Sequence, residues 1–129
     1  MSVDWYRSDG ERVTSDEAQR LLLDVRGRLL AQDVVRVGGV VVVVSTWFTV
    51  TDLGFAANGR PLLWQTIVSD LAMHADIGRY TTREKAARGH AEAVDMITER
   101  LSDLVARAAL DGTLDGTQPS AVFHPEPGA

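Results

Sequence analysis

The sequence contains no cysteine, and this absence excludes several classes of protein at once. A chain without cysteine has no disulfide framework, no thiolate zinc site and no cysteine nucleophile. Long apolar runs are also absent. Ser45 and Thr46 interrupt the most apolar stretch, Val40 to Val50, which is shorter than the about 20 residues of a membrane helix. The polar, acidic N-terminus is not typical of a signal peptide. We therefore expect a cytoplasmic protein without a membrane partner.

Positive charge is scarce, and lysine is almost missing. The net charge is −5, and all but one of the 13 cations are arginine, Lys85 being the exception. An acidic protein has no general attraction for phosphate backbones, so this charge disfavours nonspecific nucleic-acid binding. The arginine bias is typical of a high-GC genome. It also supplies guanidinium forks that can bind carboxylate or phosphate.

The rest of the composition indicates one globular domain with a tail. Hydrophobic residues make up 45 % and charged residues 24 %, as in ordinary soluble proteins. From residue 111 onward glycine and proline interrupt the chain and no core-forming pattern remains. We predict a single α+β domain over residues 1–110 and a Pro/Gly-rich tail over residues 111–129. Such a tail frays unless something holds it, so an ordered tail would be held by a neighbouring subunit of a homo-oligomer or by a crystal contact.

The N-terminal region predicts a short strand and a short helix. The segment Asp4 to Glu11 predicts a strand or extended arm followed by an Asp-Gly turn, because glycine accepts a positive φ. Thr14 and Glu17 then fit a capping box, in which each side chain satisfies a free amide at a helix start. A helix is expected from about Ser15 to Asp24.

A long amphipathic helix is the clearest element. Thr81 and Glu84 fit a second capping box, and the helix is expected over Thr82 to Leu110. Gly89 weakens it by about 1 kcal/mol relative to alanine, which predicts that another element approaches closely there. The residues of the expected buried stripe recur every three or four positions: Ala86, Ala87, His90, Val94, Ile97, Leu101, Leu104, Val105 and Ala108.

Two strands and a tight turn are expected before the middle of the chain. Arg28 to Val37 and Val40 to Thr51 are rich in β-branched residues, and the two glycines between them suit a type I′ turn. This turn places Asp33 opposite Val44, a carboxylate on an otherwise apolar face. Either that face lies at the sheet edge or a bulge shifts the register.

The remaining strands complete an α+β fold. Strands are expected at Leu62 to Ser69 and at about Ile77 to Tyr80. We predict a three- to four-stranded antiparallel sheet packed by a short N-terminal helix and a long C-terminal helix. Because Val40 to Val44 has no polar alternation, both faces of that strand should be covered, by helices or by a partner chain.

Residues that could carry chemistry are few. The histidines are His74, His90 and His124, and His90 is expected to be a core residue bonded to a strand backbone. His74 with Asp70 and Asp76 forms a weak metal-ligand cluster, and a serine hydrolase would need a histidine beside Ser45. Since no catalytic or cofactor motif is present, we expect no enzyme activity, no cofactor and no bound metal.

One group of aromatic and charged residues is a candidate ligand-binding surface. Aromatic rings with arginine can stack on and hold a planar anionic ligand. The alternative is that the aromatics belong to the core and the arginines are solvated or pair with the aspartate. The residues of this candidate site are Trp47, Asp52, Phe55, Arg60, Arg79 and Tyr80.

Four blocks of the sequence match the pattern of one known family. They are Trp5-Tyr6-Arg7 with Asp9-Gly10, Ser45-Thr46 with Asp52 and Phe55, Gly59 with Pro61 to Val68, and Arg79 to Thr82 with Glu84, Ala86 and Gly89-His90. The sequence thereby resembles small uncharacterised proteins of actinobacteriophages and actinobacterial genomes, over roughly Asp4 to Met96. It departs from them at Leu53, where they carry histidine, and at Gln65, where they carry glutamate. The resemblance implies the cytoplasm of a bacterial host and no particular mechanism.

Three functions are consistent with these features. The first is a non-enzymatic phage-type accessory protein that binds a host protein or a small anionic signalling ligand. The second is a virion structural or assembly protein whose tail docks on a neighbouring subunit. The third is a small hydrolase, and the presence of histidines is its only support. We favour the first.

Overall fold

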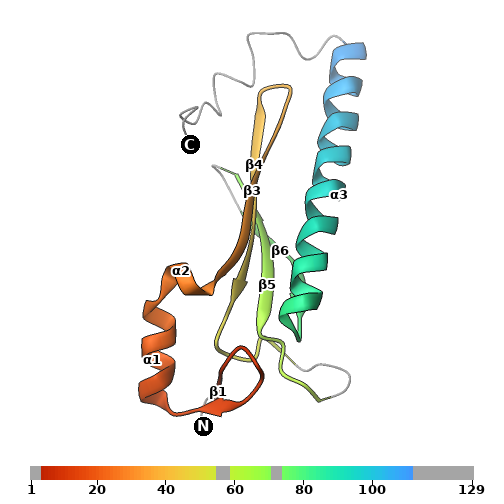
Figure 1. The fold of residues 1–129 in the computed structure, drawn as a ribbon. Coiled ribbons are helices and arrows are strands. Elements are labelled where there is room, and N and C mark those ends of the chain that lie inside the picture. Colours follow the sequence, from red (N-terminus) through yellow and green to blue (C-terminus); the bar gives the residue numbers. More distant parts are fainter. Residues whose placement is uncertain (1–3, 55–58, 71–73, 112–129) are drawn as a thin grey trace.

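The computed structural model describes residues 4–54, 59–70 and 74–111, and the structural statements below concern those residues. The fold is α+β, as predicted: a four-stranded antiparallel sheet of order β3-β4-β5-β6, a two-stranded sheet β1-β2, and a long C-terminal helix (Figure 1). The elements in chain order are β1 (Trp5–Tyr6), β2 (Arg12–Val13), α1 (Ser15–Leu23), α2 (Val25–Arg28), β3 (Leu29–Val37), β4 (Val40–Phe48), β5 (Trp64–Ser69), β6 (His74–Tyr80) and α3 (Arg83–Leu110).

The β3–β4 hairpin has the turn and the register that the sequence predicts. Gly38 and Gly39 have φ values of 57° and 85°, as both central residues of a type I′ turn require. Asp33 lies opposite Val44, and β3 is an edge strand of the sheet. Of the two explanations for a carboxylate on this face, the sheet edge is the one that holds.

β4 is shorter than predicted and ends at Phe48. Val50 follows with φ 69°, a left-handed conformation that a β-branched residue rarely adopts. Two interactions with the N-terminal strand accompany this bend: the Tyr6 amide donates to the Val50 carbonyl at 2.8 Å, and Trp5 forms a β-bridge with Thr51. The chain therefore leaves the main sheet after Phe48, and Val50 and Thr51 hold β1 beside the sheet.

The first helix ends one residue before the predicted boundary. Thr14 caps α1 by accepting from the Glu17 amide at 3.2 Å. The Glu17 carboxylate binds Arg7 at 3.1 Å instead of returning to the cap, so only half of the predicted capping box forms. Asp24 then caps the short helix α2, which the sequence did not predict, by accepting from the Gly27 amide at 3.0 Å.

α3 runs without a break and contacts all four strands of the main sheet. Its cap is one residue later than predicted: Thr82 accepts from the Lys85 amide at 3.1 Å. The hydroxyl of Thr81, the predicted cap, is buried without a hydrogen-bond partner. Gly89 faces the ring of Tyr80, which a Cβ atom at this position would overlap. The close approach predicted at this glycine is thus confirmed.

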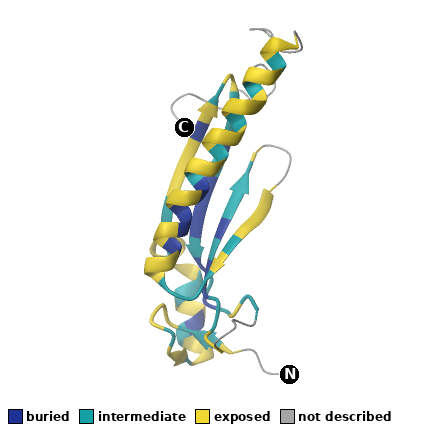
Figure 2. Ribbon diagram, turned by 90° about the vertical axis from the view of Figure 1, so that its right-hand side faces the viewer, coloured by how far each residue is buried: buried dark blue, intermediate teal, exposed yellow. Residues whose placement is uncertain are grey.

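The core between α3 and the sheet has a polar layer in its middle. Viewed from the α3 side, buried residues lie on the strands behind the helix and on part of α3 itself (Figure 2). One apolar cluster includes Phe48 and Trp64, and a second includes Val44. The buried hydroxyl of Thr46 lies between Val44 and Phe48 on the same face of β4. The core is therefore divided where His90 of α3 meets the sheet.

Candidate functional site

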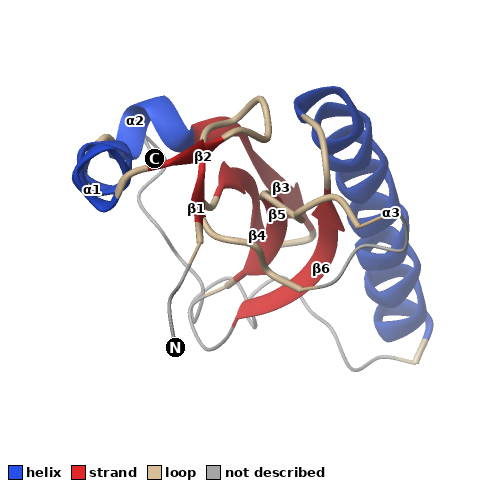
Figure 3. Ribbon diagram, turned by 90° about the horizontal axis from the view of Figure 1, so that it is seen from below, coloured by secondary structure: helices blue, strands red, loops and turns tan. Residues whose placement is uncertain are grey.

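One face of the main sheet has no described element packed on it. Side chains alternate along a strand, and the even-numbered residues of β4 face α3, since Val44 packs with Ala93 of the helix. In Figure 3, α3 lies along this face of the sheet, and Figure 1 shows that α1 and α2 lie beside the lower end of the sheet, next to β1. We call the opposite surface the open face. Its residues, taken from the strand register, are Gln32, Val34, Arg36, Val41, Val43, Ser45, Trp47, Gln65, Ile67, Ser69, His74, Asp76 and Arg79.

The middle of the open face is apolar apart from Ser45, which is only 6 % exposed. Val41, Val43, Trp47 and Ile67 are half-buried, and Val34 is 42 % exposed. We expected the valine run to be covered on both faces. Within the described segments that expectation is met on the α3 side only, because no described element covers the side of Val41 and Val43. This incomplete coverage marks the open face as a candidate binding surface.

Three of the six predicted site residues, Trp47, Asp52 and Arg79, come together at one end of the open face. Trp47 lies opposite Gln65, and Gln65 lies opposite Arg79, so the three side chains form one row across the sheet. The Arg79 Nη1 donates to the Leu53 carbonyl at 2.7 Å. The loop that carries Leu53 is shaped by Asp52, whose carboxylate accepts from the Leu62 amide at 2.9 Å.

The other predicted site residues are not part of this row. Tyr80 points to the α3 side, where its ring packs against the core cluster. Arg60 lines a different hollow, together with Asp9 and Thr81. Phe55 lies outside the described residues. The predicted surface is therefore divided, and the part that remains together is Trp47, the loop at Asp52, and Arg79.

Asp76, which the sequence suggested only as a metal ligand, holds Arg79 in place. The Asp76 Oδ2 accepts from the Arg79 Nε at 2.7 Å and from the Gln65 Nε2 at 2.9 Å. Burial alone would raise the pKa of Asp76, but these two hydrogen bonds and the charge of Arg79 hold it below the ordinary value of 3.8. Asp76 is ionised at neutral pH, and it fixes the polar rim beside Trp47.

This pKa predicts a pH-dependent effect of replacing Asp76. A carboxyl whose pKa is lowered by folding stabilises the fold above its unfolded pKa, and the stabilisation is lost as the pH falls through the folded pKa. Because the site is partly exposed, Asp76→Asn should lower the free energy of unfolding by about 0.5 kcal/mol at neutral pH. Urea unfolding at neutral pH and at about pH 3 would measure this. The difference should be smaller at the lower pH, and Asp103→Asn, an exposed change on α3, is the matched control.

The fold also contains a buried series of hydrogen bonds centred on His90. The His90 Nε2 lies 2.7 Å from the Asp33 Oδ2, and the Nδ1 lies 2.8 Å from the Thr46 Oγ1, which is 2.6 Å from the Thr66 Oγ1. A carboxylate can only accept, so the His90 Nε2 donates to Asp33, and in a ring that carries one proton the Nδ1 accepts from the Thr46 hydroxyl. The histidine is in the core as predicted, but its partners are side chains and not strand backbone.

This arrangement supports a structural role for His90. An Asp–His–hydroxyl series is the order found in serine hydrolases. Here, however, both threonines are fully buried, so a substrate cannot reach either hydroxyl. Ser45 projects to the open face, away from His90. His90 is thus on the other side of the sheet from Ser45, and His74, which shares the open face with Ser45, is separated from it by β5.

The remaining site expectations concern metals and membranes. Among residues 4–54, 59–70 and 74–111, no three His, Asp or Glu side chains lie together as a metal site would require. The considered cluster of His74, Asp70 and Asp76 is thus not formed. Within the same segments, no helix combines the length and apolar character needed to cross a membrane.

Comparison with known proteins gives no match: no family model fits the sequence, and no curated protein or solved structure is similar to it. The resemblance to actinobacteriophage proteins therefore stays a prediction. The candidate site rests on its geometry alone.

Proposed function

We propose that the protein is a non-enzymatic accessory protein, of the kind that actinobacteriophages carry, and that it binds a protein of the bacterial host through the open face. The observation that carries this proposal is the apolar middle of that face, on which no described element is packed. A contiguous exposed apolar patch rimmed by polar residues is typical of a protein-binding surface. The phage setting comes from the sequence resemblance.

The dimensions of the open face favour one short amphipathic helix as the occupant. From Val41 to Trp47 the strand rises about 20 Å, and the four strands span about 15 Å. This footprint of about 300 Å² is well below the about 800 Å² per partner of a stable dimer. It matches a single helix, which is about 10 Å across. Such a helix would repeat on this side of the sheet the packing that α3 makes on the other.

The proposal predicts which peptides the protein selects and which variant loses them. From a displayed library of host peptides, the purified chain should select sequences with apolar residues at helical spacing. Val43→Glu places a charge in the middle of the contact and should weaken the selected peptides by at least about tenfold. Isothermal titration calorimetry with synthetic peptides would measure this change.

Two controls make the experiment decisive. Ala91→Glu adds the same charge to an exposed position of α3 and should leave binding unchanged. The Val43→Glu protein should still unfold cooperatively, at a somewhat lower midpoint, since Val43 is half-buried but lies outside the two core clusters. Extended peptides without helical spacing, or peptides that bind both variants equally, would contradict the proposal. A wild-type dimer that Val43→Glu dissociates would assign the open face to a second copy of the chain instead.

The alternative of a virion structural or assembly protein stays a prediction. Its support was a valine strand covered on both faces and an ordered tail at residues 111–129. Within the described segments β4 is covered on the α3 side only, and residues 112–129 lie outside the described structure.

A further inference from the structure

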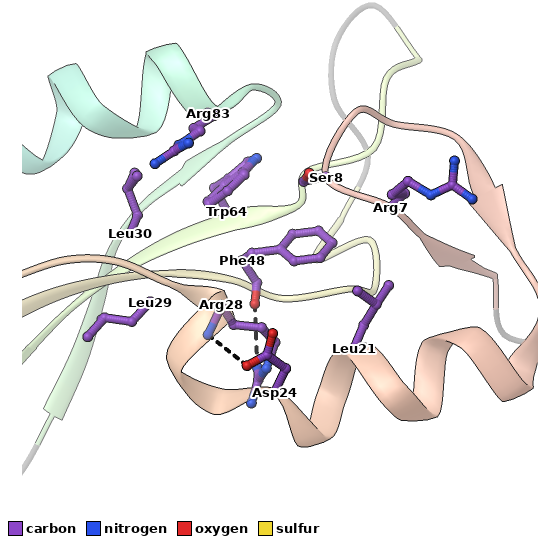
Figure 4. Close-up of a pocket in the computed structure, with 11 residues that line it drawn as sticks. Arg7, Ser8, Leu21, Asp24, Arg28, Leu29, Leu30, Phe48, Trp64 and Arg83 are labelled. Carbon is purple, nitrogen blue, oxygen red and sulfur yellow. Dashed lines mark hydrogen bonds between the residues drawn. The ribbon is translucent and has the colours of Figure 1, made fainter.

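A cavity of about 200 Å³ lies at the end of the molecule where α1 and α2 meet the ends of β4 and β5. Its apolar wall includes Phe48 and Trp64, whose ring centroids are 5.3 Å apart. In Figure 4, Trp64 and Arg83 line one side of this cavity, and Arg28 and Asp24 line another. None of these residues belongs to the open face, so the cavity is a separate feature.

Two buried donors in the cavity wall have no hydrogen-bond partner. They are the Nε1 of Trp64 and the Nε of Arg28. Trp64 is only 5 % exposed, so its indole N–H is removed from bulk water as well. A buried donor without an acceptor has lost its hydrogen bond to water and gained none in return, which destabilises the fold. Both side chains line the cavity, so its wall contains two polar groups that have no acceptor among the described residues.

The charges around the cavity are mostly positive, although the chain as a whole is acidic. Arg7 is paired with Glu17 at 3.1 Å. Arg28 makes one long bond, from its Nη1 to the Phe48 carbonyl at 3.4 Å. Within the described part of the chain, no carboxylate lies within 4.0 Å of Arg28 or Arg83. The opposing charge is Asp24, which caps α2. An incoming anion would therefore meet two cations that the fold does not neutralise.

Size, polarity and charge together define a ligand class. A cavity of about 150 Å³ in another protein holds one benzene molecule, so 200 Å³ accommodates a single ring with a small polar group. Guanidinium groups bind carboxylates through paired hydrogen bonds. Asp24 disfavours a doubly charged ligand such as the phosphate dianion, because like charges repel. We infer that this cavity binds a small monoanion with a flat apolar body, an aryl carboxylate of the size of benzoate.

Nuclear magnetic resonance of the full chain, labelled with ¹⁵N and titrated with benzoate, would test the inference. The indole N–H signal of Trp64 should shift saturably, with a dissociation constant on the order of 1 mM. The signal of Trp47, on the open face, should not move and serves as an internal control. Benzamide has the same shape without the charge and should bind at least about tenfold more weakly. Inorganic phosphate should be similarly weak.

Arginine variants connect the binding to the two free cations. Arg83→Gln changes an exposed residue and should keep the fold while weakening benzoate by about tenfold. Arg28→Gln should have at least the same effect. Arg100→Gln, on the exposed side of α3, is the matched control and should change nothing. The inference is overturned if the Trp64 signal does not shift, if benzamide or phosphate binds as well as benzoate, or if both cavity variants bind like the wild type.

Discussion

Replacing His90 by leucine should lower the free energy of unfolding by about 2–3 kcal/mol. The substitution removes the acceptor of the Thr46 hydroxyl in a part of the core where both threonines are fully buried. A buried hydroxyl that loses its partner keeps its full desolvation penalty, which the burial of a leucine side chain does not offset. Denaturant unfolding of wild type and variant, with equal slopes, would measure the difference.

Two further variants distinguish the loss of hydrogen bonds in the polar layer from a loss of side-chain packing. Asp33→Asn keeps an acceptor for the His90 Nε2 at a side chain that is 57 % exposed, so it should cost less than about 1 kcal/mol. Combining His90→Leu with Thr46→Val and Thr66→Val removes donors and acceptors together and should recover much of the lost stability. A combined variant less stable than His90→Leu alone would contradict this account.

Replacing Gly89 by alanine should destabilise the protein by about 1–3 kcal/mol. Helix propensity alone predicts the opposite, a gain of about 1 kcal/mol. The sign reverses because a Cβ atom at Gly89 would overlap the ring of Tyr80, which is confined between Gly89 and Gly78. Thermal and urea unfolding of the variant would establish the sign.

The control for Gly89 uses a nearby position on the same helix. Ala87 is exposed, so Ala87→Gly should follow propensity and cost about 1 kcal/mol. Gly89→Ala combined with Tyr80→Leu should recover stability relative to Gly89→Ala, because the smaller side chain leaves room for the new methyl group. A stabilising effect of Gly89→Ala alone would show that the ring moves freely, against the packing described.

Local signals predicted most of the fold. The paired glycines fixed the β3–β4 turn and, through side-chain alternation, its register, since a slip of one residue would exchange the two faces. The spacing of apolar residues predicted α3 almost to its end. The errors lie where a long-range contact decides the local structure. β4 stops at Phe48 because the residues that follow bond to β1. The Glu17 carboxylate binds Arg7 instead of completing the capping box.

The candidate site was only partly predictable for the same reason. Asp76 and Arg79 are three residues apart, and in a regular strand such residues face opposite sides of the sheet. An irregularity in the β5–β6 register brings both to the open face, and nothing in the local sequence indicates it. The cavity at Trp64 was missed because its arginines come from three separate parts of the chain. Only the excess of arginine pointed to anion binding.

The edges of the sheet have a consequence for solubility. The valine run of β4 has the composition of an aggregation-prone segment, but β4 lies between β3 and β5 and has no free edge. The strands at the two edges, β3 and β6, both pair irregularly with their neighbours, and β3 carries the inward-facing Asp33. Irregular pairing and inward charges prevent further strands from adding to a sheet. The protein can therefore present an apolar sheet face to a partner without its edges recruiting further copies into fibres.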